Sequence, residues 1–128
     1  MNELETLKTK KVLYVEDDTL TVEFTKRLIQ KDVKEIFVAN NGKEGLQMYQ
    51  DEKPDIIITD IEMPVMNGID MIKEVRKKSS TKPIIILTAY EDESYHAGNM
   101  ANIVLLKPIN KNHLKEALLR CLETEVQF

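Results

Sequence analysis

Five short runs of β-branched and aliphatic residues, each followed by a helix-length segment, constrain the fold of this chain more than any other feature. The runs cover residues 12–15, 36–39, 56–58, 84–87 and 103–106. Continuous apolar runs of this kind are typical of strands that are covered on both faces, as in a parallel sheet. The alternation therefore predicts an α/β fold, with a doubly wound parallel sheet, right-handed crossovers and helices on both faces.

The segments between the runs show helical periodicity of unequal strength. The last segment carries one apolar stripe, formed by Leu114, Ala117, Leu118, Cys121 and Leu122. Because Cys121 is the single cysteine and lies on this stripe, we interpret it as a core residue that forms no internal disulfide.

Two further segments are predicted with different strength. Leu20, Phe24 and Leu28 recur at helical spacing and predict a helix after the first strand. Residues 91–100 contain few apolar side chains and predict a short, weakly anchored helix.

Size and charge limit the class of protein. The 128 residues predict one domain over residues 11–124, with a polar N-terminal extension over 1–10 and a C-terminal tail over 125–128. A net charge of −4 argues against nucleic acid as a direct partner. The N-terminus lacks the apolar stretch of a secretory signal, and no run approaches membrane-spanning length. We therefore expect a cytoplasmic protein that does not bind membranes.

Polar residues follow four of the five predicted strands. Glu16 and Asp17 follow the first strand, Asp60 the third, Thr88 the fourth and Lys107 the fifth. In a doubly wound sheet the site forms beyond the carboxyl ends of the strands, so these side chains should converge there. Acids at strand ends can also act only as helix caps, and for Asp18 and Thr19 we expect that role.

The gathered acids predict a cation. Two carboxylates ~4 Å apart repel each other by ~4 kcal/mol at an effective dielectric constant near 20. Oxygen ligands favour a hard ion, and partly hydrated Mg²⁺ suits a site with few protein ligands. Without metal, Lys107 could pair with Asp60. Such a carboxylate could attack phosphorus and form an acyl phosphate, with Thr88, Lys107 and Mg²⁺ neutralising the phosphoryl oxygens.

From about residue 11 to residue 122, the chain closely resembles the receiver domain of two-component response regulators. The matching motifs, in order, are VLYVEDD (12–18), NNGKEG (40–45), PDIIITDIEMPVMNG (54–68), PIIILTA (83–89) and LLKP (105–108). The resemblance implies a flavodoxin-like (βα)5 sheet with strand order 2-1-3-4-5. It also implies a phosphorylation-controlled signalling switch rather than an enzyme.

The resemblance assigns roles by position. Asp60 would accept a phosphoryl group from a histidine kinase or phosphotransfer protein, and a protein output partner or a fused effector domain would respond. Asp17 would bind Mg²⁺ directly, Glu16 through water, and Glu62 through its backbone carbonyl. Thr88 and Lys107 would contact the phosphoryl group.

Further expectations from the resemblance concern the backbone and the output. The Lys107-Pro108 bond would be cis, and the output surface would involve the fourth helix, the fifth strand and the fifth helix. Val104 replaces an aromatic residue common in the family, so the signal would travel differently. Tyr90 could substitute for it. The extra carboxylate of Glu62 could either repel an attacking hydroxide or help to orient a water.

Two other functions remain open from the sequence. One is a receiver-like module that binds a protein without phosphorylation. The other is an Mg²⁺-dependent phosphatase with an aspartyl nucleophile, although no cap domain is available to enclose a substrate. His96 and His113 have no partners at metal-ligand spacing and are expected at the surface.

Overall fold

The computed structural model describes residues 2–89 and 100–126. Its strands are β1 (Lys11–Val15), β2 (Glu35–Ala39), β3 (Ile56–Asp60), β4 (Ile84–Thr88) and β5 (Ile103–Leu106). The helices of the described residues are α1 (Glu3–Leu7), α2 (Thr19–Ile29), α3 (Gly42–Glu52), α4 (Gly68–Lys78) and α6 (Lys111–Val126).

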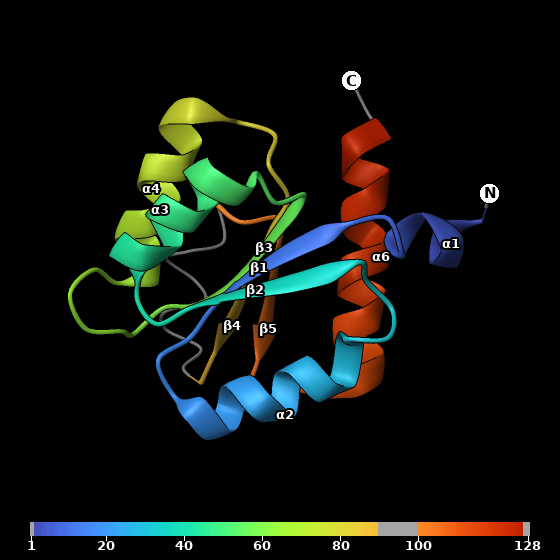
Figure 1. The fold of residues 1–128 in the computed structure, drawn as a ribbon, viewed down its shortest axis with the longest axis horizontal. Helices are drawn as coiled ribbons and strands as arrows, with labels where there is room; N and C mark the ends of the chain where they lie inside the picture. Colours follow the sequence, from blue (N-terminus) through green and yellow to red (C-terminus); the bar gives the residue numbers. More distant parts are fainter. Residues whose placement is uncertain (1, 90–99, 127–128) are drawn as a thin grey trace.

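All five strands lie parallel in one sheet, in the order β2-β1-β3-β4-β5 (Figure 1). This arrangement confirms the predicted fold class and strand order. The chain moves outward from β1 in one direction to β2 and then in the other to β3. The strand order therefore reverses beside β1, which is where doubly wound sheets form their binding crevices.

Each face of the sheet carries its own apolar core. Side chains of β1 alternate between the two, with Tyr14 in the core beneath α2 and α6, and Leu13 in the core beneath α3 and α4 (Figure 1). Cys121 is fully buried in the first core, which confirms that it is a core residue.

Helix α2 presents a different face to the sheet from the one that its largest apolar residues suggest. The helix itself is confirmed, and the Asp18 side chain accepts a hydrogen bond from the Thr21 N–H, as expected of an N-cap. However, Leu20 and Phe24 are 81% and 50% exposed. The buried residues of the helix are instead Val22, Thr25 and Ile29.

The N-terminal segment, predicted as a polar extension, includes a packed helix. Helix α1 contacts α6, and Leu7 is completely buried in the first core. The helix is capped by Asn2, whose side chain accepts from the Glu5 N–H at 2.8 Å. Leu7 lies among polar residues in the sequence, so no apolar pattern indicates that it is buried.

Three further predictions concern the segment 91–100, the C-terminal boundary and the histidines. The predicted helix over residues 91–100 falls almost entirely outside the described residues, as do Tyr90 and His96. Helix α6 continues to Val126, past the domain boundary predicted at residue 124. His113 is exposed on α6, as expected.

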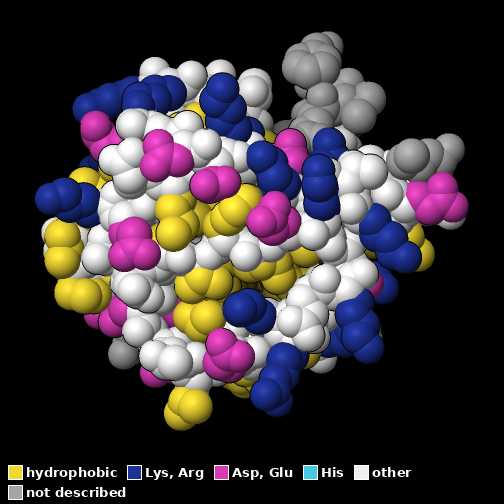
Figure 2. All heavy atoms as spheres, viewed as in Figure 1, with side chains coloured by type: hydrophobic (Ala, Val, Ile, Leu, Met, Phe, Trp, Pro, Cys, Tyr) yellow, Lys and Arg dark blue, Asp and Glu magenta, His cyan; other side chains and the backbone are white. Residues whose placement is uncertain are grey.

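The edge strand β2 is incompletely covered. Its residues 36–38 are half-buried, and Figure 2 shows hydrophobic side chains gathered at the centre of this face, around the position of β2.

None of the helices in the described part of the chain is long and apolar enough to span a membrane.

Candidate functional site

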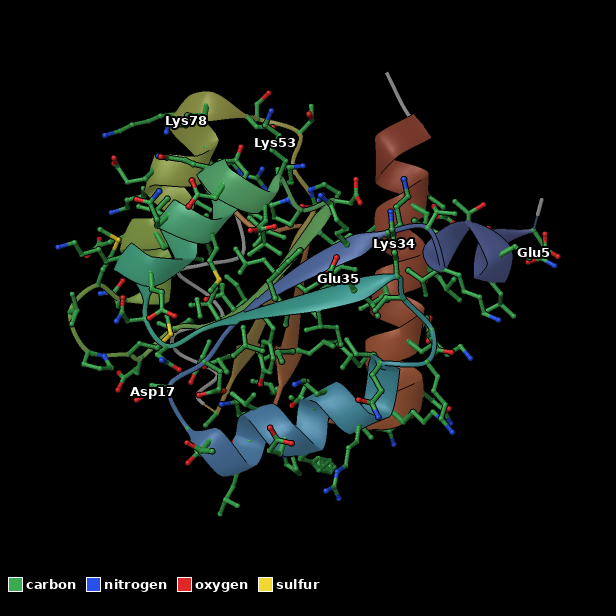
Figure 3. All side chains as sticks on the ribbon, in the orientation of Figure 1. Glu5, Asp17, Lys34, Glu35, Lys53 and Lys78 are labelled. Carbon is green, nitrogen blue, oxygen red and sulfur yellow. The ribbon has the colours of Figure 1, made fainter. Side chains whose placement is uncertain are left out.

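The five parallel strands end at the same edge of the sheet, and four of these ends carry a polar residue predicted for the site. Glu16 and Asp17 follow β1, Asp60 ends β3, and Thr88 ends β4. Lys107 follows β5 directly. Figure 3 shows Asp17 at this edge, where β1 gives way to α2. The structure thus brings together the residues that the sequence places at strand ends.

Three carboxylates form the centre of the site. Glu16, Asp17 and Asp60 each offer an oxygen, and these oxygens lie within 4.8 Å of one another. They differ in burial, because Glu16 is 1% exposed, the Asp60 side chain is 14% exposed and Asp17 is exposed. The repulsion expected from the sequence is therefore concentrated between Glu16 and Asp60.

Lys107 bridges the two more buried acids. Its Nζ lies 2.9 Å from Glu16 Oε1 and 3.2 Å from Asp60 Oδ2. The expected pairing with Asp60 is present, and the shorter contact with Glu16 was not predicted. A buried carboxylate needs such a partner, because an isolated charge in this position is costly.

Burial and pairing act against each other on the ionisation of these groups. Burial raises the pKa of Glu16, the hydrogen bond from Lys107 opposes that rise, and the nearby Asp60 adds to it. Burial alone would lower the pKa of Lys107, but its contacts with Glu16 and Asp60 outweigh this effect and raise it. Lys107 therefore remains positively charged at neutral pH.

The loop after β3 holds Asp60 in place. The Asp60 Oδ1 accepts a hydrogen bond from the Ile61 N–H at 2.7 Å. The Gly68 N–H donates to the Ile61 carbonyl at 2.8 Å, which brings the start of α4 against the end of β3. A Cβ on Gly68 would lie 2.0 Å from the Asp60 carbonyl oxygen, so only glycine allows this approach.

Backbone contacts also fix the far side of the site. Thr88 is completely buried at the end of β4, and its carbonyl accepts a hydrogen bond from the Lys107 N–H at 2.7 Å. The Lys107-Pro108 peptide bond is cis, as the resemblance implied. The base of the lysine side chain is thus tied to β4, and its charged end reaches back to β1 and β3.

The donor set fits a hard divalent cation. Asp17 and Glu62 line an open hollow of about 540 Å³ beside the carboxylates. Three carboxylate oxygens with an adjoining hollow leave room for an ion that keeps several water ligands, as Mg²⁺ does.

The loop between β3 and α4 also contains an unusual backbone conformation. Val65 is exposed and has a φ of 70°, which is uncommon for a β-branched residue.

An apolar groove beside the site was not predicted. It has a volume of about 500 Å³ and is lined by Leu20, Thr21, Phe24, Thr25, Lys107, Pro108 and Ile109. The exposed residues of α2 form one wall of the groove. The sequence alone does not show which face of α2 is exposed, so it does not predict the groove.

Comparisons with known proteins agree with this geometry. The family model of the response regulator receiver domain matches residues 12–119. The chemotaxis protein CheY of Thermotoga maritima is 37% identical over 115 residues, covering 85% of this chain and 94% of that protein. The probable C4-dicarboxylate response regulator DctR of Bacillus subtilis is 34% identical, covering 84% of this chain and 50% of DctR. The chain therefore spans about half of DctR and almost all of that CheY.

Solved structures show the same fold. A CheY-like receiver domain protein from Methanospirillum hungatei superposes with a TM-score of 0.84 at 27% identity, covering 92% of this chain and 98% of that one. The response regulator TrrA from Thermotoga maritima, in complex with Mg²⁺-BeF, gives a TM-score of 0.81 at 34% identity, covering 88% and 99%.

Proposed function

Because the chain belongs to the response regulator receiver domain family, we propose that it is a phosphorylation-controlled switch with Asp60 as the phosphoryl acceptor. The phosphodonor is a histidine kinase or a phosphotransfer protein in the cytoplasm. The family consists of signalling domains rather than conventional enzymes, and here the chain assists its own phosphorylation without turning over a separate substrate.

The observation that carries this proposal is the contact geometry around Asp60. A strand-end carboxylate lies 3.2 Å from a lysine ammonium and within 4.8 Å of oxygens from two further acids. A site that only capped helices would not need a lysine to reach across from β5 to β1 and β3. An acceptor for a phosphoryl group does need cationic groups on several sides.

The transfer follows from these positions. An Asp60 oxygen attacks the phosphorus atom of a phosphohistidine, an O–P bond forms, and the P–N bond breaks with its electron pair returning to the imidazole. Lys107 leaves its contact with the carboxylate and pairs with a phosphoryl oxygen, while the Thr88 side chain contacts another. Asp17, Asp60 and the Glu62 carbonyl, with Glu16 acting through water, would hold Mg²⁺, and the bound ion would supply positive charge to offset that of the transferred group.

Phosphorylation would then alter the surface that a partner reads. DctR and the sensory transduction protein LytT of Oceanobacillus iheyensis are about twice as long as the part that matches this chain. The output is therefore either a separate protein or an effector domain joined to the receiver. With Val104 in place of an aromatic residue, the change at Thr88 reaches the surface without a ring that turns inward.

Intact-mass spectrometry after incubation with acetyl phosphate tests the proposal. We expect a gain of one phosphoryl group that requires Mg²⁺ and is absent from Asp60→Asn. A chain that binds Mg²⁺ but gains no phosphoryl group from acetyl phosphate or from any phosphorylated histidine protein would instead be a non-phosphorylated binding module.

A further inference from the structure

A buried hydrogen bond between two hydroxyl groups lies next to the acidic site. Tyr14, on β1, donates from its phenol to Thr25 Oγ1 on α2 at 3.2 Å. Both side chains are only 1% exposed. Each is thus removed from water and depends on the other, or on a protein neighbour, for its hydrogen bonds.

The direction of the strand places this pair beneath Glu16. Successive residues of a strand alternate between faces, so Tyr14 and Glu16 project on the same side of β1. Tyr14 is paired in register with Ile58 of β3, so Asp60 occupies the equivalent next position on that strand. Burial raises the pKa of Tyr14, and the hydrogen bond with Thr25 opposes that rise. The charges of Glu16 and Asp60 add to the rise, as does a weaker hydrogen-bonding contribution from Glu16, so the phenol keeps its proton and already lies within reach of that carboxylate.

Phosphorylation would remove the present partner of Glu16. Lys107 now contacts Glu16 at 2.9 Å, and the carboxylate is almost completely buried. When Lys107 turns toward a phosphoryl group, Glu16 loses a direct charged donor. A buried carboxylate without its donor is costly, so another donor close by would favour the phosphorylated state.

A rotation of one O–H bond supplies that donor. A phenol hydrogen can rotate about its C–O bond without movement of any heavy atom, and a hydroxyl can both donate and accept. If the Tyr14 hydrogen turns to Glu16, the Thr25 hydroxyl can donate to the Tyr14 oxygen in return. The chain Thr25 to Tyr14 to Glu16 then satisfies every member, and aligned hydrogen bonds strengthen one another.

We propose that Tyr14 is a positioning residue that takes over the hydrogen bond to Glu16 when Lys107 turns toward a phosphoryl group on Asp60. This inference rests on the proposed function. It assigns Tyr14 and Thr25 a part in the switch, whereas a purely structural pair would contribute only to the stability of the fold.

Calorimetric titration of the full chain with beryllofluoride in saturating Mg²⁺ tests the inference, since this anion mimics the phosphoryl group. We expect Tyr14→Phe to weaken beryllofluoride binding by about 10- to 100-fold, the worth of one hydrogen bond to a charged group. Binding of Mg²⁺ alone should not change, because Lys107 then still contacts Glu16. Tyr49→Phe, on α3, is the matched control and should bind both ligands as the wild type does.

Thr25→Val separates this role from a structural one. It removes the same hydroxyl–hydroxyl bond but leaves the Tyr14 hydrogen available to Glu16. It should therefore lower the melting temperature as Tyr14→Phe does, while beryllofluoride binding is retained or tightened. Equal beryllofluoride binding by Tyr14→Phe and wild type, or equal weakening in both variants, would overturn the inference.

A double-mutant cycle gives a readout without any ligand. In Lys107→Met the Glu16 side chain always lacks the lysine, and its oxygens need another donor whether or not the carboxyl group takes up a proton. Tyr14→Phe should therefore destabilise this variant more than it destabilises the wild type. Additive losses would contradict the inference. A wild-type chain that fails to bind beryllofluoride in Mg²⁺ would instead contradict the proposed function.

Discussion

Replacing Lys107 by methionine tests how the charges of the site are balanced. Methionine keeps most of the length of the side chain and removes its charge. Each ion pair of Lys107, with Nζ–O distances of 2.9 and 3.2 Å, represents about 5 kcal/mol of gross attraction at an effective dielectric constant near 20. The wild-type fold takes the lysine ammonium partly out of water at a cost of several kcal/mol, and the variant avoids that cost, which offsets much of the loss.

Proton uptake limits the remaining loss. In the variant the buried Glu16 can be protonated, and from its ordinary pKa of 4.5 this costs about 3 kcal/mol at pH 7. We therefore expect Lys107→Met to lower the free energy of unfolding by about 2–3 kcal/mol without Mg²⁺. Urea titrations followed by circular dichroism measure this value.

The pH dependence of the loss identifies its cause. The folded variant holds the Glu16 proton with a raised pKa, whereas the unfolded chain releases it near the ordinary pKa. Lowering the pH from 7 toward 5 therefore favours the folded variant, and the deficit should shrink by up to about 1.4 kcal/mol per pH unit.

A matched surface lysine provides the control. Lys77 pairs with Glu74 at 2.7 Å, but its side chain is 72% exposed, so Lys77→Met should change stability by less than about 0.5 kcal/mol. A Lys107→Met protein as stable as the wild type at pH 7 without Mg²⁺ would refute the reasoning. So would a deficit that does not shrink as the pH falls.

Three further substitutions test other parts of the structure. Asp17→Asn should weaken Mg²⁺ binding in calorimetry and raise metal-free stability by at most about 1 kcal/mol, because Asp17 is exposed and its repulsion is screened; a clearly less stable variant would contradict the strain between the acids. Leu7→Ala should cost about 2–4 kcal/mol in urea titrations, since Leu7 is fully buried, without preventing phosphorylation by acetyl phosphate. Gly68→Ala should displace the end of β3, since its Cβ would meet the Asp60 carbonyl oxygen; wild-type stability and wild-type phosphorylation together would show that the loop tolerates the methyl group.

The sequence predicts the sheet well because its strands are buried on both faces. Continuous apolar runs such as residues 56–58 and 84–87 leave little ambiguity, and polar residues at their ends mark the site edge. The convergence of Asp60 with Lys107 follows from topology alone, because parallel strands bring their carboxyl ends to one edge.

The face that a helix buries, and the side of a strand on which a single side chain lies, are harder to predict. The face that α2 turns to the sheet depends on its cap and on the β1 connection, so Phe24 lies half-exposed although it is the largest apolar residue of the helix. The pairing of Glu16 with Lys107 depends on which side of β1 the carboxylate takes. Strand periodicity contains that information, but only once the first residue of the strand is known.

The packing of α1 bears on where this domain can be cut. The family match begins at residue 12, and a fragment that started there would lack the helix that lies against α6. The base of one core would then be open to water where Leu7 now closes it. Such a fragment should be prone to self-association through the exposed core. A fragment that keeps α1 and its cap Asn2 should stay monomeric more readily than one that begins at the first strand.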